Sequence, residues 1–507
     1  MKSVTHKRFN FPLSSIKQLA GQTAIYGFSS ILGRLLNYLL VPLYTRVFLP
    51  AQYGVVTEMY AYASFLMIVF TYGMETAYFR FASQQRDRKK VFATSMLSLI
   101  GTSLLLVMVI YFFSGDISQW MTRVTSQNSS DYQRYIIWFA LILSADAITA
   151  IPFAKLRIEN KAFRFAFIRM AGILVNIGFN LFFLVVCPKL DSGSWLLRFY
   201  DSSLGVEYVF ISNFISSVFT LVLLLPEFRS MSFSFDKKLW NEMLIYALPL
   251  LVAGFAGMIN ETMDRIFLKY LVPGKTEALT QLGIYGACYK VSILMTLFIQ
   301  TFRYAAEPFF FAHAEMENAK ETYARVMNYF IITCTVIFLG VMLYMDFVKY
   351  FIGEEFRSGL KVVPILLMAN LCLGVFYNLA IWYKLTSKTM WGAYLALIGA
   401  GITILLNFIL IPMMGYMGAA WATLACYASM MVISFLVGQK FYRVEYDLRK
   451  FFIYMVSALF IYFFSTKLQN YFAMNTLWTS IMNTMLLILF GAIIYLTEKN
   501  KSSNLAQ

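Results

Sequence analysis

Four basic residues lie within apolar stretches that are long enough to cross a membrane, namely Arg34, Arg265, Lys290 and Arg303. A charged side chain at the centre of a bilayer costs about 2.5–3.5 kcal/mol on insertion scales, so each of them needs a partner or a water-filled cavity. Arginine suits a phosphorylated ligand, because its planar guanidinium can donate two hydrogen bonds to one anion. We therefore predict that Arg34, near the middle of its stretch, faces a cavity and binds phosphate. The alternative is that Arg34 is buried against a carboxylate.

The other three basic residues are also candidates for contact with an anionic ligand. Two of these three, like Arg34, have a structural alternative. Arg265, like Arg46, falls at the end of an apolar stretch, where an arginine can reach the membrane interface or cap a helix C-terminus. Arg303 precedes Glu307 by four residues, a spacing at which two side chains can pair along one helix face.

Acidic residues in or beside the same stretches are candidates for ion coupling or gating, namely Glu58, Glu75, Asp146, Glu261, Asp264 and Glu307. Asp146 and Glu261 are the candidate sites for H+ or Na+, and the alternative for both is a structural hydrogen bond to neighbouring polar side chains. Glu75 and Glu307 are predicted to form a matched pair of carboxylates. Each would be held by a nearby arginine, Arg80 for the first and Arg303 for the second.

Membrane-spanning helices must position these residues. Of the 507 residues, 60% are hydrophobic and 13% are charged, whereas soluble chains are about half apolar and about a quarter charged. A spanning helix needs about 20 apolar residues, and such stretches recur along the whole chain. We expect an all-α integral membrane protein with about fourteen spanning helices, near residues 19–42, 56–79, 91–113, 134–154, 166–187, 206–226, 244–268, 284–308, 325–345, 360–383, 392–411, 416–437, 451–466 and 476–496.

The net charge of +16 would suggest a nucleic-acid partner in a soluble protein. In a membrane protein, lysine and arginine instead gather in the short loops on the cytoplasmic side. Of the 42 basic residues, 27 fall in predicted loops on the side of the N-terminus and 11 on the opposite side. Both termini are therefore predicted to be cytoplasmic, and no nucleic-acid partner is expected. The five cysteines stand singly and there are two histidines, so we predict neither a metal site nor a cofactor.

Similar segments that recur in the same order indicate an internal repeat of six helices. They are Thr45–Leu49 with Asp264–Leu268, Tyr53–Gly54 with Tyr285–Gly286, Glu75–Phe79 with Glu307–Phe311, and Asn180–Leu184 with Asn407–Ile411. An even number of helices per repeat gives both halves the same orientation, so their pseudo-two-fold axis runs along the membrane normal. We predict six-helix lobes over 1–230 and 231–440, and two extra helices with a tail over 441–507. Such transporters bind substrate between the repeats, near the midplane.

Several of these motifs together resemble one known family. They are Thr45–Gly54, Gly73–Ala77, Phe79–Phe81, Asp264–Arg265, Gly283–Gly286, Asn407, Pro412, Gly415–Ala420 and Ala422–Thr423. With them the chain resembles the polysaccharide-transporter branch of the MOP (MATE-like) flippase superfamily. The resemblance implies two lobes that form a V, with helices one, two, seven and eight lining a central cavity.

The resemblance also implies a function and a location. It implies alternating access that moves a lipid-linked oligosaccharide from the cytoplasmic to the outer leaflet of a bacterial inner membrane. The usual cargo is undecaprenyl pyrophosphate carrying a repeat unit of O-antigen, capsule or exopolysaccharide. A polysaccharide polymerase and glycosyltransferases are then expected partners. The alternative is a cation or drug antiporter on the same fold, which would favour an acidic cavity. An enzyme is not expected, because external loops of about 20 residues hold no acid–base constellation.

The repeat and the resemblance together suggest an outer gate. Glu58 and Lys290 are at equivalent positions, each four residues beyond a matched glycine, Gly54 or Gly286. Because the resemblance places helices two and eight across the cavity from each other, these opposite charges can meet when the outer side closes. Such a pair would be partly buried, so that loss of one partner would cost several kcal/mol. The alternative is that both charges are solvated at the rim, where an ion pair contributes little.

Overall fold

The computed structural model of the protein describes residue 27 and residues 29–84, 87–191, 194, 195, 198, 200–229, 233–472 and 475–504, with side chains in the last helix up to residue 499. The predicted first span, 19–42, therefore lies partly outside the described residues. Its described part is helical over residues 29–38 and leads into α2 (Leu40–Val47).

Helices and loops make up the described residues, which contain no strand, in agreement with the predicted all-α class. The helices of the first half of the chain are α3 (Pro50–Thr71), α4 (Met74–Ser83), α5 (Arg88–Phe112), α6 (Ser114–Thr122), α7 (Ser129–Ile158), α8 (Ala162–Leu181) and α9 (Glu207–Phe228). Those of the second half are α10 (Lys237–Leu271), α11 (Lys275–Val291), α12 (Ile293–His313), α13 (Ala319–Leu343), α14 (Met345–Val348), α15 (Val363–Leu379), α16 (Ile381–Leu385), α17 (Met390–Met414), α18 (Tyr416–Phe441), α19 (Leu448–Phe472) and α20 (Thr476–Asn504).

Among the described residues, 12 helices are long and apolar enough to cross a membrane, and the bent pair α11 and α12 raises this number to 13 if it forms one span. Each predicted span from 56–79 onward overlaps one of them. The expected count of fourteen also includes the first span, of which the structure describes only a part.

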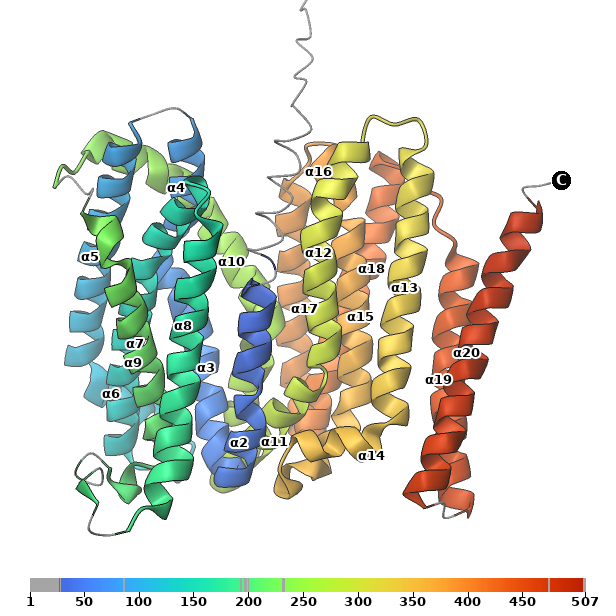
Figure 1. The fold of residues 1–507 in the computed structure, drawn as a ribbon, viewed down its shortest axis with the longest axis horizontal. Helices are drawn as coiled ribbons and strands as arrows, with labels where there is room; N and C mark the ends of the chain where they lie inside the picture. The colour runs from blue at the N-terminus through green and yellow to red at the C-terminus, as the bar shows by residue number, and fades with distance from the viewer. Residues whose placement is uncertain are drawn as a thin grey trace, which may run out of the picture.

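Two groups of roughly parallel helices stand side by side in Figure 1, α3 to α9 on the left and α12 to α18 to the right of the centre. Helix α10 packs against both α3 and α17, and α11 packs against α3. The pair α19 and α20 lies outside the second group, where α19 packs against α13. Helices α10 and α11 thus bring the second half of the chain against the first.

Helices α3 and α11 make an unusually close contact near one end of the molecule, the lower end in Figure 1. A Cβ atom on Gly54 would lie 2.1 Å from the carbonyl oxygen of Leu279, and one on Gly283 would lie 1.9 Å from that of Pro50. Real Cβ atoms do not come so near, so only glycine permits this approach of two backbones. We call this contact the α3–α11 seal.

Two helices next to the centre of the molecule are interrupted. Between α3 and α4, Tyr72 and Gly73 adopt positive φ angles of 33° and 74°, and Gly73 packs against the backbone of Ala247 in α10. Helices α11 and α12 are bent by 52° around Ser292. Discontinuous helices are typical of transporter binding sites, because unwound backbone in a membrane must be covered by protein or line a cavity.

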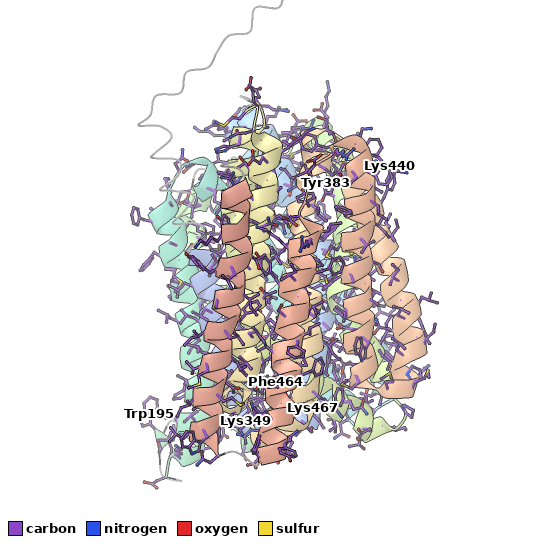
Figure 2. All side chains as sticks on the ribbon, turned by 90° about the vertical axis from the view of Figure 1, so that its right-hand side faces the viewer. Trp195, Lys349, Tyr383, Lys440, Phe464 and Lys467 are labelled. Atoms are coloured by element: carbon purple, nitrogen blue, oxygen red, sulfur yellow. The ribbon has the colours of Figure 1, made fainter. Side chains whose placement is uncertain are left out.

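The distribution of side chains along the molecule fits a membrane protein. Figure 2 shows Lys440 near one end and Lys349 and Lys467 near the other. Between these ends many large apolar side chains are exposed on the outside of α19 and α20, such as Phe460 and Ile488. Exposed apolar residues at this density are unfavourable in water and favourable against lipid tails.

Candidate functional site

A cavity of about 450 Å³ lies at the centre of the molecule, enclosed by the helical residues 34–44 and by α3, α8, α9, α10 and α11. Gly286 and Thr57, which line the cavity, touch each other across α11 and α3 one turn beyond Gly283. The cavity therefore lies directly next to the α3–α11 seal. Five tyrosines and three asparagines also line it: Tyr38, Tyr44, Tyr53, Tyr60, Tyr289, Asn37, Asn176 and Asn213.

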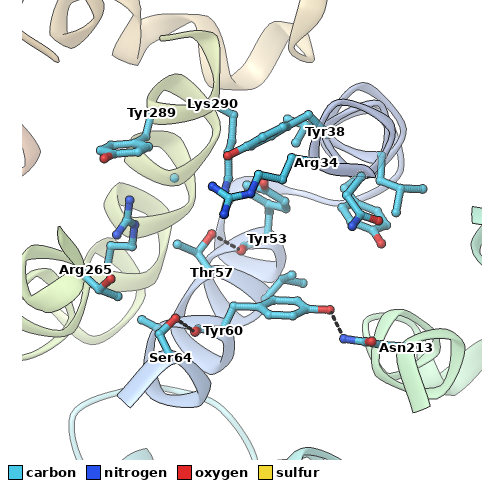
Figure 3. Close-up of a pocket in the computed structure, with 18 of the residues that line it drawn as sticks. Arg34, Tyr38, Tyr53, Thr57, Tyr60, Ser64, Asn213, Arg265, Tyr289 and Lys290 are labelled. Carbon is cyan, nitrogen blue, oxygen red and sulfur yellow. Dashed lines mark hydrogen bonds between the residues drawn. The ribbon is translucent and has the colours of Figure 1, made fainter. Parts of the chain in front are cut away.

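Three of the four basic residues predicted to bind substrate line this cavity. Figure 3 shows Arg34, Arg265 and Lys290 approaching the same space from three different helical segments. The one carboxylate among the lining residues is Glu261, so the cavity has an excess of positive charge. Cations gathered at a site of low dielectric attract an anion strongly. That these residues contact a ligand stays a prediction.

Arg34 projects into the cavity and keeps an exposed side chain. Its Nη1 donates a hydrogen bond to Oε1 of Gln300 on α12. This partner is a neutral amide, unlike the carboxylate that the alternative reading required. The guanidinium is therefore not neutralised by the group that it contacts, and it has further N–H donors for a ligand.

Arg265 lines the cavity from within α10, six residues before this helix ends at Leu271. Its Nη1 donates to the carbonyl oxygen of Glu261 at 2.7 Å, and its guanidinium lies over the ring of Tyr289 at 4.3 Å. The neighbouring Asp264 is buried behind the cavity wall, 3.7 Å from Arg265, and accepts a hydrogen bond from Tyr285 at 2.6 Å. Asp264 thus joins α10 to α11 and orients Arg265, while Arg265 itself lines the cavity.

The predicted pair of Glu58 and Lys290 does not form, and the prediction is corrected here. Glu58 is fully buried, pairs with the equally buried Lys269 of α10, and accepts a hydrogen bond from Tyr132 at 2.7 Å. Lys290 instead lies 4.9 Å from the ring of Tyr38 at the cavity wall. The repeat put the two residues at equivalent positions of the sequence, but it did not determine the neighbours that their helix faces meet. Lys269 was missed because it was assigned to an outer loop, whereas α10 continues to Leu271.

The matched carboxylates Glu75 and Glu307 both have a basic partner, as predicted, but not the partners expected. Arg157 of α7 lies 3.5 Å from Glu75, and Lys384 of α16 lies 2.6 Å from Glu307. The predicted partners are stacked on aromatic rings instead.

Those predicted partners, Arg80 and Arg303, lie over the rings of Tyr246 and Tyr377 at 4.2 and 4.6 Å. Both arginine side chains are exposed beside these rings, and basic residues on neighbouring helices pair with the carboxylates instead. Sequence spacing within one helix could not reveal those bases.

Asp146, a candidate ion site, lies on α7, close to Ser217 of α9. It also lies within electrostatic reach of Arg169 on α8. Arg169 is a further charged residue within a span, and it was left out because it was counted with the basic residues of a cytoplasmic loop although it falls inside the predicted span 166–187. In the structure α8 begins at Ala162, seven residues before Arg169, and Arg169 has an exposed side chain within electrostatic reach of Arg34. A role for Asp146 or Glu261 in ion coupling stays a prediction.

Arg303, the fourth predicted basic residue, lies at a different site. It lines a smaller cavity of about 110 Å³ between α12, α15 and α16, together with Glu307 and Lys384. The four basic residues are therefore divided between two cavities that share α12 as a neighbour.

Known structures share this arrangement of helices. The chain is similar to a structure described as lipid II flippase MurJ in an inward closed conformation, with a TM-score of 0.72, 14% identity, and coverage of 93% of this chain and 98% of that one. It is also similar to an inward-facing multidrug resistance MATE family transporter of the MOP superfamily, with a TM-score of 0.62, 13% identity, and coverage of 84% and 97%. At such identities the likeness establishes the fold and leaves the ligand open.

The sequence itself gives the family. No match is found among curated proteins. Residues 19–314, more than half of the chain, match the model of a family described as polysaccharide biosynthesis protein. With its multi-pass helical fold and its match to this model, the chain belongs to the polysaccharide biosynthesis protein family.

Proposed function

We propose that the protein is a flippase that moves an oligosaccharide linked to undecaprenyl pyrophosphate across the bacterial inner membrane, for the assembly of a surface polysaccharide such as O-antigen or capsule. The observation that carries this proposal is the basic cavity between the two halves of the chain. Arg34, Arg265 and Lys290 line it and Glu261 is their one acidic counterpart there. A pyrophosphate group supplies the negative charge that such a cavity lacks.

The proposed cycle uses the α3–α11 seal. In the described state, Gly54 and Gly283 allow α3 and α11 to close one end of the cavity. The predicted excess of basic loops on the opposite side assigns the seal to the outer face, with both termini in the cytoplasm. The higher TM-score to an inward-facing MATE transporter than to an outward-facing one, 0.62 against 0.55, supports this assignment. Transport then requires the seal to part as the lobes 1–230 and 231–440 tilt.

Alternating access also needs each lobe to keep its shape while the contact between the lobes changes. The ion pair of Glu75 with Arg157 joins α4 to α7, and that of Glu307 with Lys384 joins α12 to α16. Both pairs stay within a predicted lobe. The pair of Glu58 with Lys269 joins α3 to α10 and therefore bridges the two lobes beside the seal.

A transport assay tests the proposal. Purified protein is placed in liposomes that contain lipid-linked oligosaccharide, and the transfer of inner-leaflet cargo to the outer leaflet is followed with an added glycosidase. We expect the wild type to transfer the cargo faster than protein-free liposomes, and Arg34→Ala and Lys290→Ala to be slow. Arg325→Ala is the control, because Arg325 is exposed on α13 and pairs with Glu321 on the same helix. No transfer by the wild type would overturn the proposal.

A cation antiporter is the second candidate, and it rests on Glu261, which is exposed in the cavity. A carboxylate in such a position can bind H+ or Na+ in exchange for a cationic substrate. Export of a cationic dye from proteoliposomes separates the two functions. Dye transport that is lost in Glu261→Gln and kept in Arg34→Ala would favour the antiporter. For the flippase we expect cargo transfer that is lost in Arg34→Ala and kept in Glu261→Gln.

A further inference from the structure

The smaller cavity between α12, α15 and α16 has the composition of a ligand site. It lies close to the central cavity, because Gln300, the partner of Arg34, and Arg303, which lines the smaller cavity, are three residues apart on α12. Three residues of α-helix correspond to a rise of about 4.5 Å. The two cavities are therefore neighbours in the fold.

Hydrogen-bond donors in the smaller cavity lack acceptors. Asn378 is 4% exposed, lines the cavity, and its Nδ2 has no hydrogen-bond partner among the described residues. A buried donor without a partner is rare in native proteins and indicates a ligand or a water molecule. Arg303 has an exposed side chain that lies over the face of Tyr377 at 4.6 Å, so its N–H groups can bind a ligand oxygen in place of water. The donors in this cavity therefore favour a ligand that has several hydrogen-bond acceptor oxygens.

The charge of the site limits that ligand further. Lys384 and Glu307 form an ion pair at 2.6 Å, so Arg303 remains as the one uncompensated charge among the residues that line the cavity. One positive charge balances a monoanion such as a carboxylate, and it is insufficient for the several charges of a pyrophosphate. The planar fork of Arg303 matches both oxygens of a carboxylate.

The remaining walls are aromatic. Tyr377, Tyr383, Phe302 and Phe310 line the cavity, and aromatic rings pack well against the apolar C–H face of a sugar ring. A volume of about 110 Å³ admits part of one sugar ring and its substituent rather than an oligosaccharide. Aromatic walls, one net positive charge and orphaned donors together fit a sugar that bears a carboxylate.

We propose that this cavity is a subsite for an acidic sugar of the cargo, in which Arg303 and Asn378 donate hydrogen bonds to the sugar carboxylate and the tyrosines contact its ring. The proposal rests on the proposed function, since the pyrophosphate of the same cargo would lie in the central cavity beside Arg34. It specifies the class of glycan that this flippase accepts, namely one that contains a uronic acid or a similar acidic residue.

Ligand-observed NMR on the purified protein in nanodiscs tests the subsite without any transport. The probes are sodium glucuronate, methyl glucoside and inorganic phosphate, each offered alone and then in competition. We expect saturation transfer to glucuronate, about tenfold weaker binding of the uncharged glucoside, and no displacement of glucuronate by phosphate. Equal binding of the glucoside would overturn the assignment to an acidic sugar. Displacement by phosphate would overturn it in favour of a phosphate site.

Variants of residues that line the smaller cavity test whether glucuronate binds there. Arg303→Gln and Asn378→Leu should each weaken glucuronate binding about tenfold, with Arg303→Lys intermediate because the charge remains and the fork is lost. Arg34→Gln should slow transport but keep glucuronate binding, so a failure of the proposed function and a failure of the subsite give different results. Arg325→Gln controls for a general loss of positive charge. Wild-type glucuronate binding in both Arg303→Gln and Asn378→Leu would overturn the proposal.

Discussion

Two neighbouring regions of this protein differ in how completely the charged side chains of their spanning helices are paired. In the central cavity, Arg34, Arg265 and Lys290 line open space with a single carboxylate, Glu261, beside them. Beside the α3–α11 seal, the ion pair of Glu58 and Lys269 is fully buried and Tyr132 donates a further hydrogen bond to it. The first region leaves an excess of positive charge facing open space, where we propose that the cargo binds, and the second balances its charge within the protein.

The two arrangements of charge should affect different properties of the protein, namely its stability and its binding of a ligand. An ion pair shielded from both water and lipid depends on both partners, because either one alone would be an unpaired buried charge. A charge in a wet cavity is solvated when no ligand is bound, so removing it changes stability little and ligand binding greatly. Mutation of the buried ion pair should therefore mainly lower stability. Mutation of the cavity residues should mainly slow transport.

The largest expected effect is on stability beside the seal. Lys269→Met leaves the carboxylate of Glu58 buried without its cation and should cost about 3–5 kcal/mol. The double variant with Glu58→Leu should recover most of that loss, since an apolar pair can replace a buried ion pair. Thermal unfolding in detergent measures both. Lys290→Met in the cavity is the matched control and should unfold like the wild type. A double variant as unstable as the single one would show that the ion pair is not the cause.

The cavity should show the reverse pattern. Arg34→Ala is expected to slow cargo transfer about 10- to 100-fold, which corresponds to the loss of a charged hydrogen bond of about 1.5–3 kcal/mol. Arg34→Lys should transfer cargo at a rate between those of the wild type and Arg34→Ala, because it keeps the charge and loses the bidentate geometry. The melting temperature should stay that of the wild type in both variants. Wild-type transfer by both Arg34→Ala and Arg34→Glu would remove Arg34 from the binding site.

The seal itself offers a smaller perturbation. In Gly283→Ala the new methyl group would meet the carbonyl oxygen of Pro50, and overpacking of this kind costs about 1–3 kcal/mol. This overpacking destabilises only the conformation in which α3 and α11 are in contact. The fraction of molecules with an open seal should therefore rise. A cysteine introduced at Thr57 should then react faster with a membrane-impermeant thiol reagent. Gly101→Ala, where a methyl group would meet nothing within 4 Å, should leave the labelling rate unchanged.

The smallest effect is expected at the orphaned amide of the second cavity. Asn378→Leu removes a buried donor that has no partner among the described residues, so without ligand it should be neutral or stabilising by about 1 kcal/mol. Asn180→Leu is the matched control, because that amide accepts from Tyr44 at 2.9 Å and donates to the carbonyl oxygen of Asn176 at 2.8 Å. It should destabilise the protein. Equal loss of stability in both variants would mean that Asn378 is satisfied in the ligand-free state.

Much of this architecture was accessible from the sequence. Spans could be placed because an apolar stretch of about 20 residues is a local property, set by the thickness of the bilayer. Arg34, Arg265 and Lys290 could be named because a charge inside such a stretch is costly wherever it lies. The glycines of the seal also appeared in the sequence, where Gly54 belongs to a repeated motif and Gly283 to a motif that carries the family resemblance, although their contact with each other could not be predicted.

Only the tertiary structure decided which charges meet. Glu58 pairs with Lys269, and Glu307 pairs with Lys384, through contacts between helices far apart in the chain. Helix ends mattered equally, since Lys269 lies one residue beyond the predicted span 244–268 and yet falls within α10, which continues to Leu271. Hydrophobicity along a chain determines how deep a residue lies in the membrane. The rotation and crossing of packed helices determine what it faces, and these depend on the shapes of all the neighbouring side chains.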